Sequence, residues 1–140
     1  SMKDAIQSYC KRTDQYIPHT KGELVRCVLE SLAVKYHFVM KKLEQCSGRT
    51  IKYLSVVGGG SRNEQLNQFI ADALNVEVVT GLTEATAIGN IIQQAVTDKK
   101  IKNIREGHQI VKNSFNFKTY YPQNSREWEL FATRMEHLIT

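Results

Sequence analysis

Apolar residues recur every three or four positions through most of the sequence, and this period predicts a largely helical protein. The longest such run covers 23–46 and contains neither glycine nor proline, so it predicts one long helix with a single buried stripe. The stripe consists of Leu24, Val25, Val28, Leu29, Leu32, Tyr36, Val39, Met40 and Leu43. Gly48 follows this run, and glycine is favoured just beyond the last turn of a helix.

Shorter runs with the same period predict further helices over 3–12, 62–74, 84–97, 104–112 and 125–138. In the helix over 84–97 we expect burial of Ala87, Ile88, Ile91, Ile92, Ala95 and Val96. Gly89 lies in the middle of that helix, where glycine costs about 1 kcal/mol relative to alanine, so close packing against another element is expected there. The tail helix is expected to bury Trp128, Phe131, Ala132, Met135 and Leu138.

Two short segments rich in β-forming residues, 53–57 and 76–80, lie on either side of the helix over 62–74. A strand, a crossover helix and a second strand form a βαβ unit, which implies two parallel strands and a right-handed crossover. Residues 113–121 alternate aromatic and polar side chains, and we expect them to form an extended arm laid over the body. The sequence therefore predicts an α/β protein that is mostly helical, with a small parallel sheet.

A turn of three glycines, Gly58, Gly59 and Gly60, joins the first predicted strand to the following helix. Ser61 and Glu64 have the spacing of a capping box, which places the start of the helix directly after the glycines. Backbone N–H groups at such a turn, with the helix dipole behind them, favour phosphate. A purely structural bend explains the three glycines equally well at this point.

The glycine turn matches neither of the two common nucleotide-binding motifs, the dinucleotide motif and the phosphate loop. A dinucleotide motif requires a glycine where Asn63 stands, and no segment of the chain has the glycine-rich phosphate loop that ends in Lys and Ser or Thr. Ligands of open parallel sheets bind outside the carboxyl ends of the strands, and the glycine turn lies at that end. The residues therefore predict an anion site without specifying the ligand.

The formal net charge is +5, with basic residues mostly scattered among glutamates as on solvated helix faces. One basic segment over 99–112 contains Lys99, Lys100, Lys102, Arg105 and Lys112, which we interpret as a surface turn and helix. No window approaches the roughly 20 apolar residues of a membrane span, and no apolar signal segment follows the N-terminus. Ser1 before Met2 is typical of a remnant of tag removal. We therefore expect a soluble protein that binds neither membrane nor nucleic acid.

The sequence contains few candidates for catalytic or metal-binding groups. Cys10, Cys27 and Cys46 lack the spacing of metal or redox motifs, which favours free thiols in a reducing cytoplasm. The histidines and aspartates are scattered, and Asp72 falls inside a predicted helix rather than beside the glycine turn. From these residues we expect no catalytic group and no metal site in the chain.

Several motifs together identify a resemblance. They are VVGGGSRN over 56–63, LNQFIAD over 66–72, VVTG over 78–81 and EATAIGN over 84–90. This combination resembles the C-terminal domain of the FGGY family of carbohydrate kinases. Further segments extend the resemblance over nearly the whole chain, among them Thr13 with Gln15 and Pro18, and Arg26-Cys27 with Ser31-Leu32-Ala33.

The resemblance implies an ATPase domain of the actin and hexokinase type, also described as ribonuclease H-like. In such kinases ATP, with Mg²⁺, and a sugar meet in a cleft between two domains, and the branch that this chain resembles acts on a ketose. Carried over by position, the resemblance places the backbone of Gly59 near the ATP phosphates and Asn63 near the adenosine. Gly58 and Gly60 would shape the loop, and Gly89 would pack its helix against the sheet.

The resemblance also implies that the catalytic aspartate and the groups that bind sugar and Mg²⁺ lie upstream of residues 3–140. We therefore expect residues 3–140 to be the nucleotide-side portion of a C-terminal domain, inactive as a kinase by itself and able to self-associate through an exposed sheet edge. The alternative is a non-catalytic interaction domain of kinase-like fold that binds an anionic partner through 99–112.

Overall fold

The computed structural model describes residues 1–139, with side chains through Glu136. It contains the helices α1 (Met2–Arg12), α2 (Lys21–Ser47), α3 (Glu64–Leu74), α4 (Ala85–Thr97), α5 (Ile104–Ser114) and α6 (Ser125–Ile139). A short 3-10 helix, η1 (Gly59–Arg62), precedes α3. The strands are β1 (Tyr53–Ser55), β2 (Glu77–Thr80) and β3 (Lys118–Tyr120). The predicted helices and the two predicted strands are all present.

Local capping explains where the long helix α2 begins and ends. Thr20 accepts a hydrogen bond from the Glu23 amide, and the Glu23 carboxylate accepts from the Thr20 amide at 3.1 Å, so the first turn is closed by a capping box. Gly48 has φ 64° and ends the helix in the left-handed conformation that glycine adopts without a steric penalty. Ser1 and Asp4 form a second capping box at the start of α1.

The sheet has the order β1-β2-β3. β1 and β2 are parallel and are connected through α3, which confirms the predicted βαβ unit. β3 pairs antiparallel with β2, with Val79 opposite Thr119, so the segment expected as an extended arm closes one side of the sheet. Its three residues were too short a run to predict as a strand from alternation. Among the described residues, β1 has one unpaired edge.

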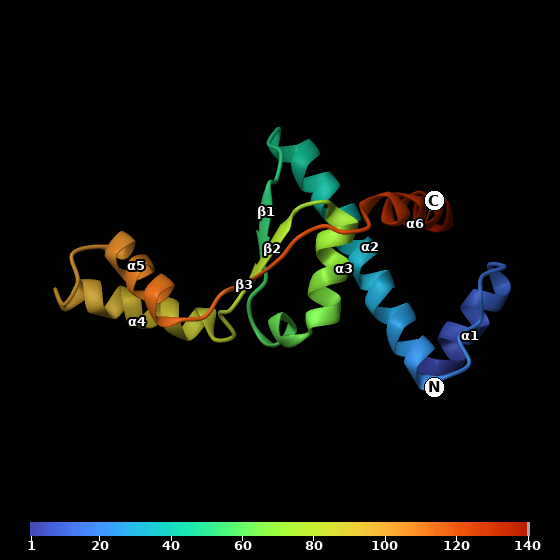
Figure 1. The fold of residues 1–140 in the computed structure, drawn as a ribbon, viewed down its shortest axis with the longest axis horizontal. Helices are drawn as coiled ribbons and strands as arrows, with labels where there is room; N and C mark the ends of the chain where they lie inside the picture. Colours follow the sequence, from blue (N-terminus) through green and yellow to red (C-terminus); the bar gives the residue numbers. More distant parts are fainter. Residues whose placement is uncertain (140) are drawn as a thin grey trace.

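The core lies where α2, α3 and α6 meet one face of the sheet (Figure 1). Ile70 and Val78 are almost completely buried, and the ring centroids of Phe69 and Trp128 lie 5.2 Å apart, which fixes α6 on α3. Trp128 and Ala132 are buried as predicted. Leu138, which was also expected to be buried, lies outside the described side chains.

The predicted buried stripe of α2 is largely exposed. The two buried side chains of α2 are Ala33 and Val34. They lie outside the predicted stripe, on a neighbouring face of the helix that packs on α3. Most of the apolar stripe instead faces solvent, with exposed fractions of 37% for Val28 and 57% for Val25. The period of the sequence located an apolar face correctly, but it could not show what covers that face.

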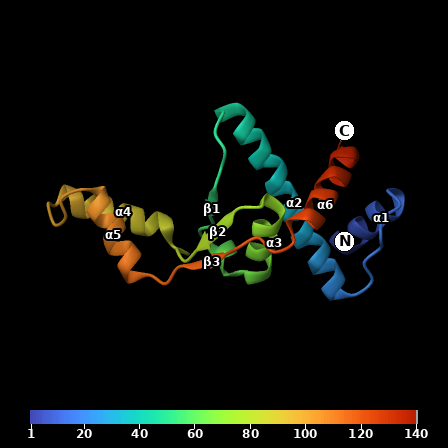
Figure 2. The ribbon, with the colours of Figure 1, turned by 45° about the horizontal axis from the view of Figure 1, so that its top comes forward.

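Helices α4 and α5 form an arm that projects from the body, at the far end from α1 (Figure 2). The predicted burial of α4 is wrong in this structure, because no residue of α4 is buried and Ile91 is 64% exposed. The expected close packing at Gly89 is also absent, since a Cβ built there meets no atom within 4 Å. Close packing occurs instead at Gly107 of α5, where a Cβ would lie 2.5 Å from Ile92 Cγ2.

Candidate functional site

The glycine turn lies at the carboxyl ends of β1 and β2, as the βαβ unit predicts. After β1 the amide of Val56 donates to the Val79 carbonyl at 2.9 Å, and the amide of Gly58 donates to the Leu82 carbonyl at 3.1 Å. Gly58 has φ 79° and ψ −168°, a combination that is essentially restricted to glycine. The turn is therefore anchored to the segment that leads into the α4–α5 arm.

The backbone of the structure demands glycine at Gly58 but not at the next two positions. Gly59 and Gly60 do not have positive φ angles, and a Cβ built on either meets no atom within 4 Å. Both residues are exposed. Across the described residues, neither of their amides donates to an acceptor outside η1, as is usual for the first residues of a helix. Two bare glycines with free N–H groups thus face solvent at this turn.

The start of α3 differs from the prediction. Ser61 is buried within η1, where its hydroxyl donates to the Gly58 carbonyl at 2.7 Å. Asn63 is the N-cap of α3, and its Oδ1 accepts from the amide of Leu66 at 3.0 Å. The predicted capping box of Ser61 with Glu64 is therefore wrong, because the 3-10 turn moves the helix start by two residues. Asn63 has the same capping chemistry as serine, so spacing alone could not choose between them.

Asn67 of α3 supports the glycine turn through a hydrogen bond to η1. The sequence analysis did not identify this residue. Its side chain is fully buried, and its Nδ2 donates to the Ser61 carbonyl at 2.9 Å. Its Oδ1 is also buried and has no hydrogen-bond partner among the described residues. A polar side chain at a position facing the core of α3 was the only signal that sequence reasoning could have used.

Charged groups near the turn are few and exposed. Lys118 of β3 donates to the Glu64 carboxylate at 2.7 Å, and this bond raises the pKa of Lys118 above its ordinary value. Both side chains are more than half exposed, so the pair contributes little to stability. Arg62 is exposed at the end of η1 and presents the nearest basic side chain in sequence to the glycines.

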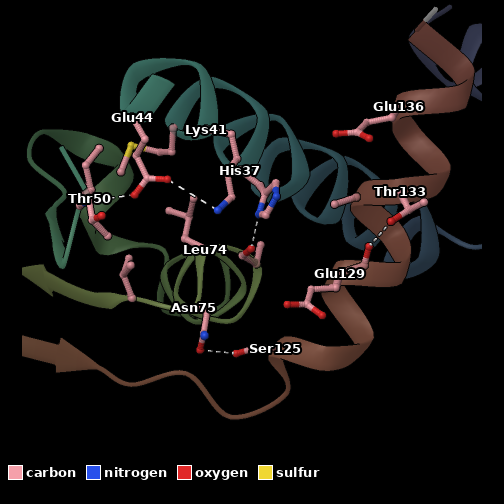
Figure 3. Close-up of a pocket in the computed structure, with 15 residues that line it drawn as sticks. His37, Lys41, Glu44, Thr50, Leu74, Asn75, Ser125, Glu129, Thr133 and Glu136 are labelled. Carbon is pink, nitrogen blue, oxygen red and sulfur yellow. Dashed lines mark hydrogen bonds and ion pairs between the residues drawn. The ribbon is translucent and has the colours of Figure 1, made fainter. Parts of the chain in front are cut away.

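A cavity lies beside the amino ends of β1 and β2, between α2, α3 and α6 (Figure 3). Its volume is about 480 Å³, and charged side chains line it from α2 and α6. The ring of His37 lies 2.6 Å from the Ala73 carbonyl, and Glu44 accepts from the Ile51 amide at 2.9 Å. The first contact joins α2 to α3, and the second joins α2 to the segment that leads into β1.

Two further observations bear on the expected ligands. No group of three or more His, Cys, Asp or Glu side chains in the described residues is arranged to hold a metal ion. The same residues include no helix both long and apolar enough to cross a membrane. The basic side chains of 99–105 are exposed at the tip of the arm, away from the glycine turn (Figure 1).

The family model for the C-terminal domain of FGGY carbohydrate kinases matches residues 1–97 of the sequence. The chain therefore belongs to the FGGY family of carbohydrate kinases, which confirms the resemblance seen in the glycine turn and in 84–90. Its mostly helical architecture with a small mixed sheet is consistent with that domain of the actin and hexokinase type of fold.

Similar curated proteins are rhamnulokinases. The rhamnulokinase of Bacteroides thetaiotaomicron is 44% identical over 128 residues, which are 91% of this chain and 26% of that protein. That of Bacillus subtilis is 41% identical over 124 residues, 89% of this chain and 26% of that protein. That of Lactiplantibacillus plantarum is 37% identical over 139 residues, 95% of this chain and 28% of that protein. The chain thus spans about a quarter of the length of these relatives.

Proposed function

We propose that this chain supplies the nucleotide-binding side of an ATP-dependent sugar kinase. In this proposal the backbone of Gly59 faces the ATP phosphates, Gly58 and Gly60 shape the turn, and Asn63 lies beside the adenosine. The proposal rests on family membership and on the geometry of the glycine turn.

The observation that carries the proposal is that Gly59 and Gly60 have no structural need to be glycine. A bend requires only Gly58, whose backbone conformation other residues avoid. Glycine at the next two positions leaves the backbone accessible to a ligand, and free N–H groups are suited to phosphate oxygens. This favours a ligand site over a simple bend.

Asn63 has one side-chain group left for a nucleotide. Its Oδ1 is occupied by the Leu66 amide, so its Nδ2 is the group that can donate to an adenosine acceptor. The cap also fixes the direction of the side chain at the start of α3. A nucleotide contact through Asn63 would therefore use a side chain that the helix has already ordered.

In the complete kinase we propose phosphoryl transfer from ATP to L-rhamnulose, giving L-rhamnulose 1-phosphate and ADP in the cytoplasm. Such transfer depends on positioning and on neutralisation of charge, which Mg²⁺ assists when it is bound. The described residues near the glycines do not fit a Mg²⁺ site, because Glu64 is paired with Lys118 and no acidic cluster is present there. We therefore place the Mg²⁺ ligands, the catalytic base and the sugar contacts outside residues 3–140.

Titration with ATP, followed by the backbone amide signals of residues 58–63, tests the nucleotide site. We expect these signals to shift at millimolar ATP. Gly59→Val should abolish the shifts without unfolding the chain, because the added side chain meets no protein atom at its Cβ but would occupy the ligand's position. Gly22→Val is the matched control, since a Cβ at Gly22 also meets nothing within 4 Å and Gly22 lies in α2.

Three outcomes would contradict the proposal. The first is the absence of any shift with ATP, and the second is an unchanged response in Gly59→Val. The third is a response that does not require adenine and collapses between low and physiological salt, which would indicate polyanion binding through 99–112. Separately, a coupled assay with ATP and L-rhamnulose should detect no turnover by this chain, and measurable turnover would overturn our placement of the catalytic groups.

A further inference from the structure

Asn67 is a polar residue on the side of α3 that faces the core. Its side chain is 0% exposed, and Ile70 and Ala71, three and four residues further along the helix, are buried as well. A leucine has the same branching and would leave no polar atom unpaired here, whereas the Oδ1 of Asn67 is buried without a partner among the described residues. Such an atom lowers stability, so packing does not explain why this residue is an asparagine. Local departures of this kind are expected at functional sites.

The amide of Asn67 begins a series of hydrogen bonds that ends in the glycine turn, which we name the Asn67 relay. Its Nδ2 donates to the Ser61 carbonyl at 2.9 Å. Ser61 in turn donates to the Gly58 carbonyl twice, from its hydroxyl at 2.7 Å and from its amide at 3.1 Å. Because a carbonyl oxygen only accepts, the first bond requires the Nδ2 side of Asn67 to face the turn. Asn67 and Ser61 are both buried, so these bonds are shielded from water.

The direction of the Gly58 carbonyl determines the direction of the Gly59 N–H. The two groups belong to one peptide unit, which is planar and trans, so they point in opposite directions. The Gly58 carbonyl is turned toward the buried Ser61, and the Gly59 N–H is therefore directed away from it. Gly59 is exposed, and among the described residues its amide donates to no acceptor outside η1. The Asn67 relay thus aims one backbone donor away from the protein interior.

Gly58 is held from its other side as well. Its amide donates to the Leu82 carbonyl at 3.1 Å, so both of its polar backbone groups are bound, one to η1 and one to the segment that follows β2. A glycine has more conformational freedom than any other residue, and these contacts remove it at the point where the chain turns. Restraint before binding reduces the entropy that a ligand would otherwise have to offset. The turn is therefore preorganised, and Asn67 supplies the restraint from the core.

We propose that Asn67 is a positioning residue for the phosphate-binding part of the nucleotide site. Acting through Ser61, it holds the peptide between Gly58 and Gly59 in the orientation from which the Gly59 N–H donates to a phosphate oxygen of ATP. This inference rests on the proposed nucleotide-binding function. It separates two ligands, because ATP uses the aimed N–H group, whereas adenosine has no phosphate to accept from it.

Two variants break the Asn67 relay at different bonds. Asn67→Leu removes the donor to Ser61 and keeps the branching of the side chain, and Ser61→Ala removes the hydroxyl that binds the Gly58 carbonyl. Each variant is titrated with ATP and with adenosine, followed by the backbone amide signals of residues 58–63. We expect each to bind ATP roughly tenfold more weakly, the effect of about one hydrogen bond to a charged group. The affinity for adenosine should stay within about twofold.

A double variant and two controls complete the test. Asn67→Leu combined with Ser61→Ala should lose no more ATP affinity than the weaker-binding single variant, because both changes act on one relay. Asn113→Leu, the same substitution at an exposed position of α5, should change neither affinity. Urea unfolding followed by Trp128 fluorescence should show an unchanged or higher midpoint for Asn67→Leu, since a buried unpaired atom is removed.

The outcomes distinguish this role from the nucleotide site itself. If the unsubstituted chain responds to neither ATP nor adenosine, or to one alone, the proposed nucleotide site fails and the positioning role fails with it. If the unsubstituted chain binds both, but Asn67→Leu keeps its ATP affinity or loses both ligands equally, the positioning role alone is overturned. Additive losses in the double variant overturn it too, because Asn67 and Ser61 would then act separately. Should Asn67→Leu not fold, the difference between ATP and adenosine in Ser61→Ala decides.

Discussion

Asp72 joins two parts of the chain that are far apart in sequence. Its carboxylate is buried and accepts from the amide of Gln123 at 2.6 Å and from the side chain of Gln68 at 3.1 Å. These bonds hold the segment that leads into α6. The sequence excluded Asp72 as a catalytic base but carried no signal of this role, because Gln123 and Asn124 lie about fifty residues later.

Replacing Asp72 should therefore loosen α6. We expect Asp72→Ala to lower the free energy of unfolding by about 2–3 kcal/mol, since hydrogen bonds to a charged and buried acceptor are lost. Urea unfolding measured by the fluorescence of Trp128, which lies on α6, reports this change. Asp98→Ala is the control, because Asp98 is exposed at the end of α4 and its removal should change stability by less than about 0.5 kcal/mol. Equal stability of the two variants would refute the assignment.

Glu44 makes the end of α2 sensitive to acid. The Ile51 amide that donates to it, with help from Lys41, holds the pKa of Glu44 below its ordinary value of 4.5. A lowered pKa in the folded state stabilises the fold above the ordinary pKa, and this contribution disappears as the pH falls through the folded value. We expect the Ile51 amide signal to titrate below pH 4.5, together with faster hydrogen exchange at that amide.

Glu44→Gln provides the matching control, because glutamine keeps an acceptor for the Ile51 amide but does not titrate. The pH dependence of the Ile51 signal should vanish in this variant. A midpoint at or above 4.5 in the unsubstituted chain would contradict the expected direction.

At the scale of the elements, the arm shows how two helical glycines can have different roles. Gly89 on α4 has open space around it, whereas Gly107 on α5 lies against Ile92. We expect Gly89→Ala to stabilise the arm by up to about 1 kcal/mol, the difference in helix propensity. Gly107→Leu should destabilise the arm, although leucine is a good helix former, because the added side chain cannot fit between the helices.

Hydrogen exchange of α4 and α5 amides distinguishes these two effects. Slower exchange in Gly89→Ala and faster exchange in Gly107→Leu are expected. The reverse order would mean that α4 packs through Gly89, as the sequence had predicted.

Elements whose apolar pattern repeats over many residues could be predicted from the sequence. The helices, the βαβ unit and the position of the glycine turn follow from period and from turn residues. β3 was missed because three residues carry too little pattern, and the cap at Asn63 was missed because Ser61 offered the same chemistry two residues earlier. Burial of α2 and α4 could not be predicted, because periodicity identifies an apolar face but not its partner.

At the scale of the whole molecule, the apolar faces of α2 and α4 and the unpaired edge of β1 are all surfaces that folded proteins usually cover, and here they are exposed. Parallel strands are normally covered on both faces, and here helix α3 and the core lie on one. The chain thus has a well-formed interior around Ile70 and Val78 and several surfaces suited to further contacts.

The arm also has a mechanical consequence. Its root is tied to the glycine turn by the hydrogen bond from the Gly58 amide to the Leu82 carbonyl. At Gly81 the two connecting segments lie so close together that a Cβ would be 2.8 Å from the Asn116 carbonyl oxygen, so a side chain at this position would clash with the returning segment. Helix α4 is about 20 Å long at 1.5 Å per residue, and a rotation of about 10° at its root displaces the tip by about 3 Å. A small rotation at the root of the arm therefore becomes a larger displacement at its tip.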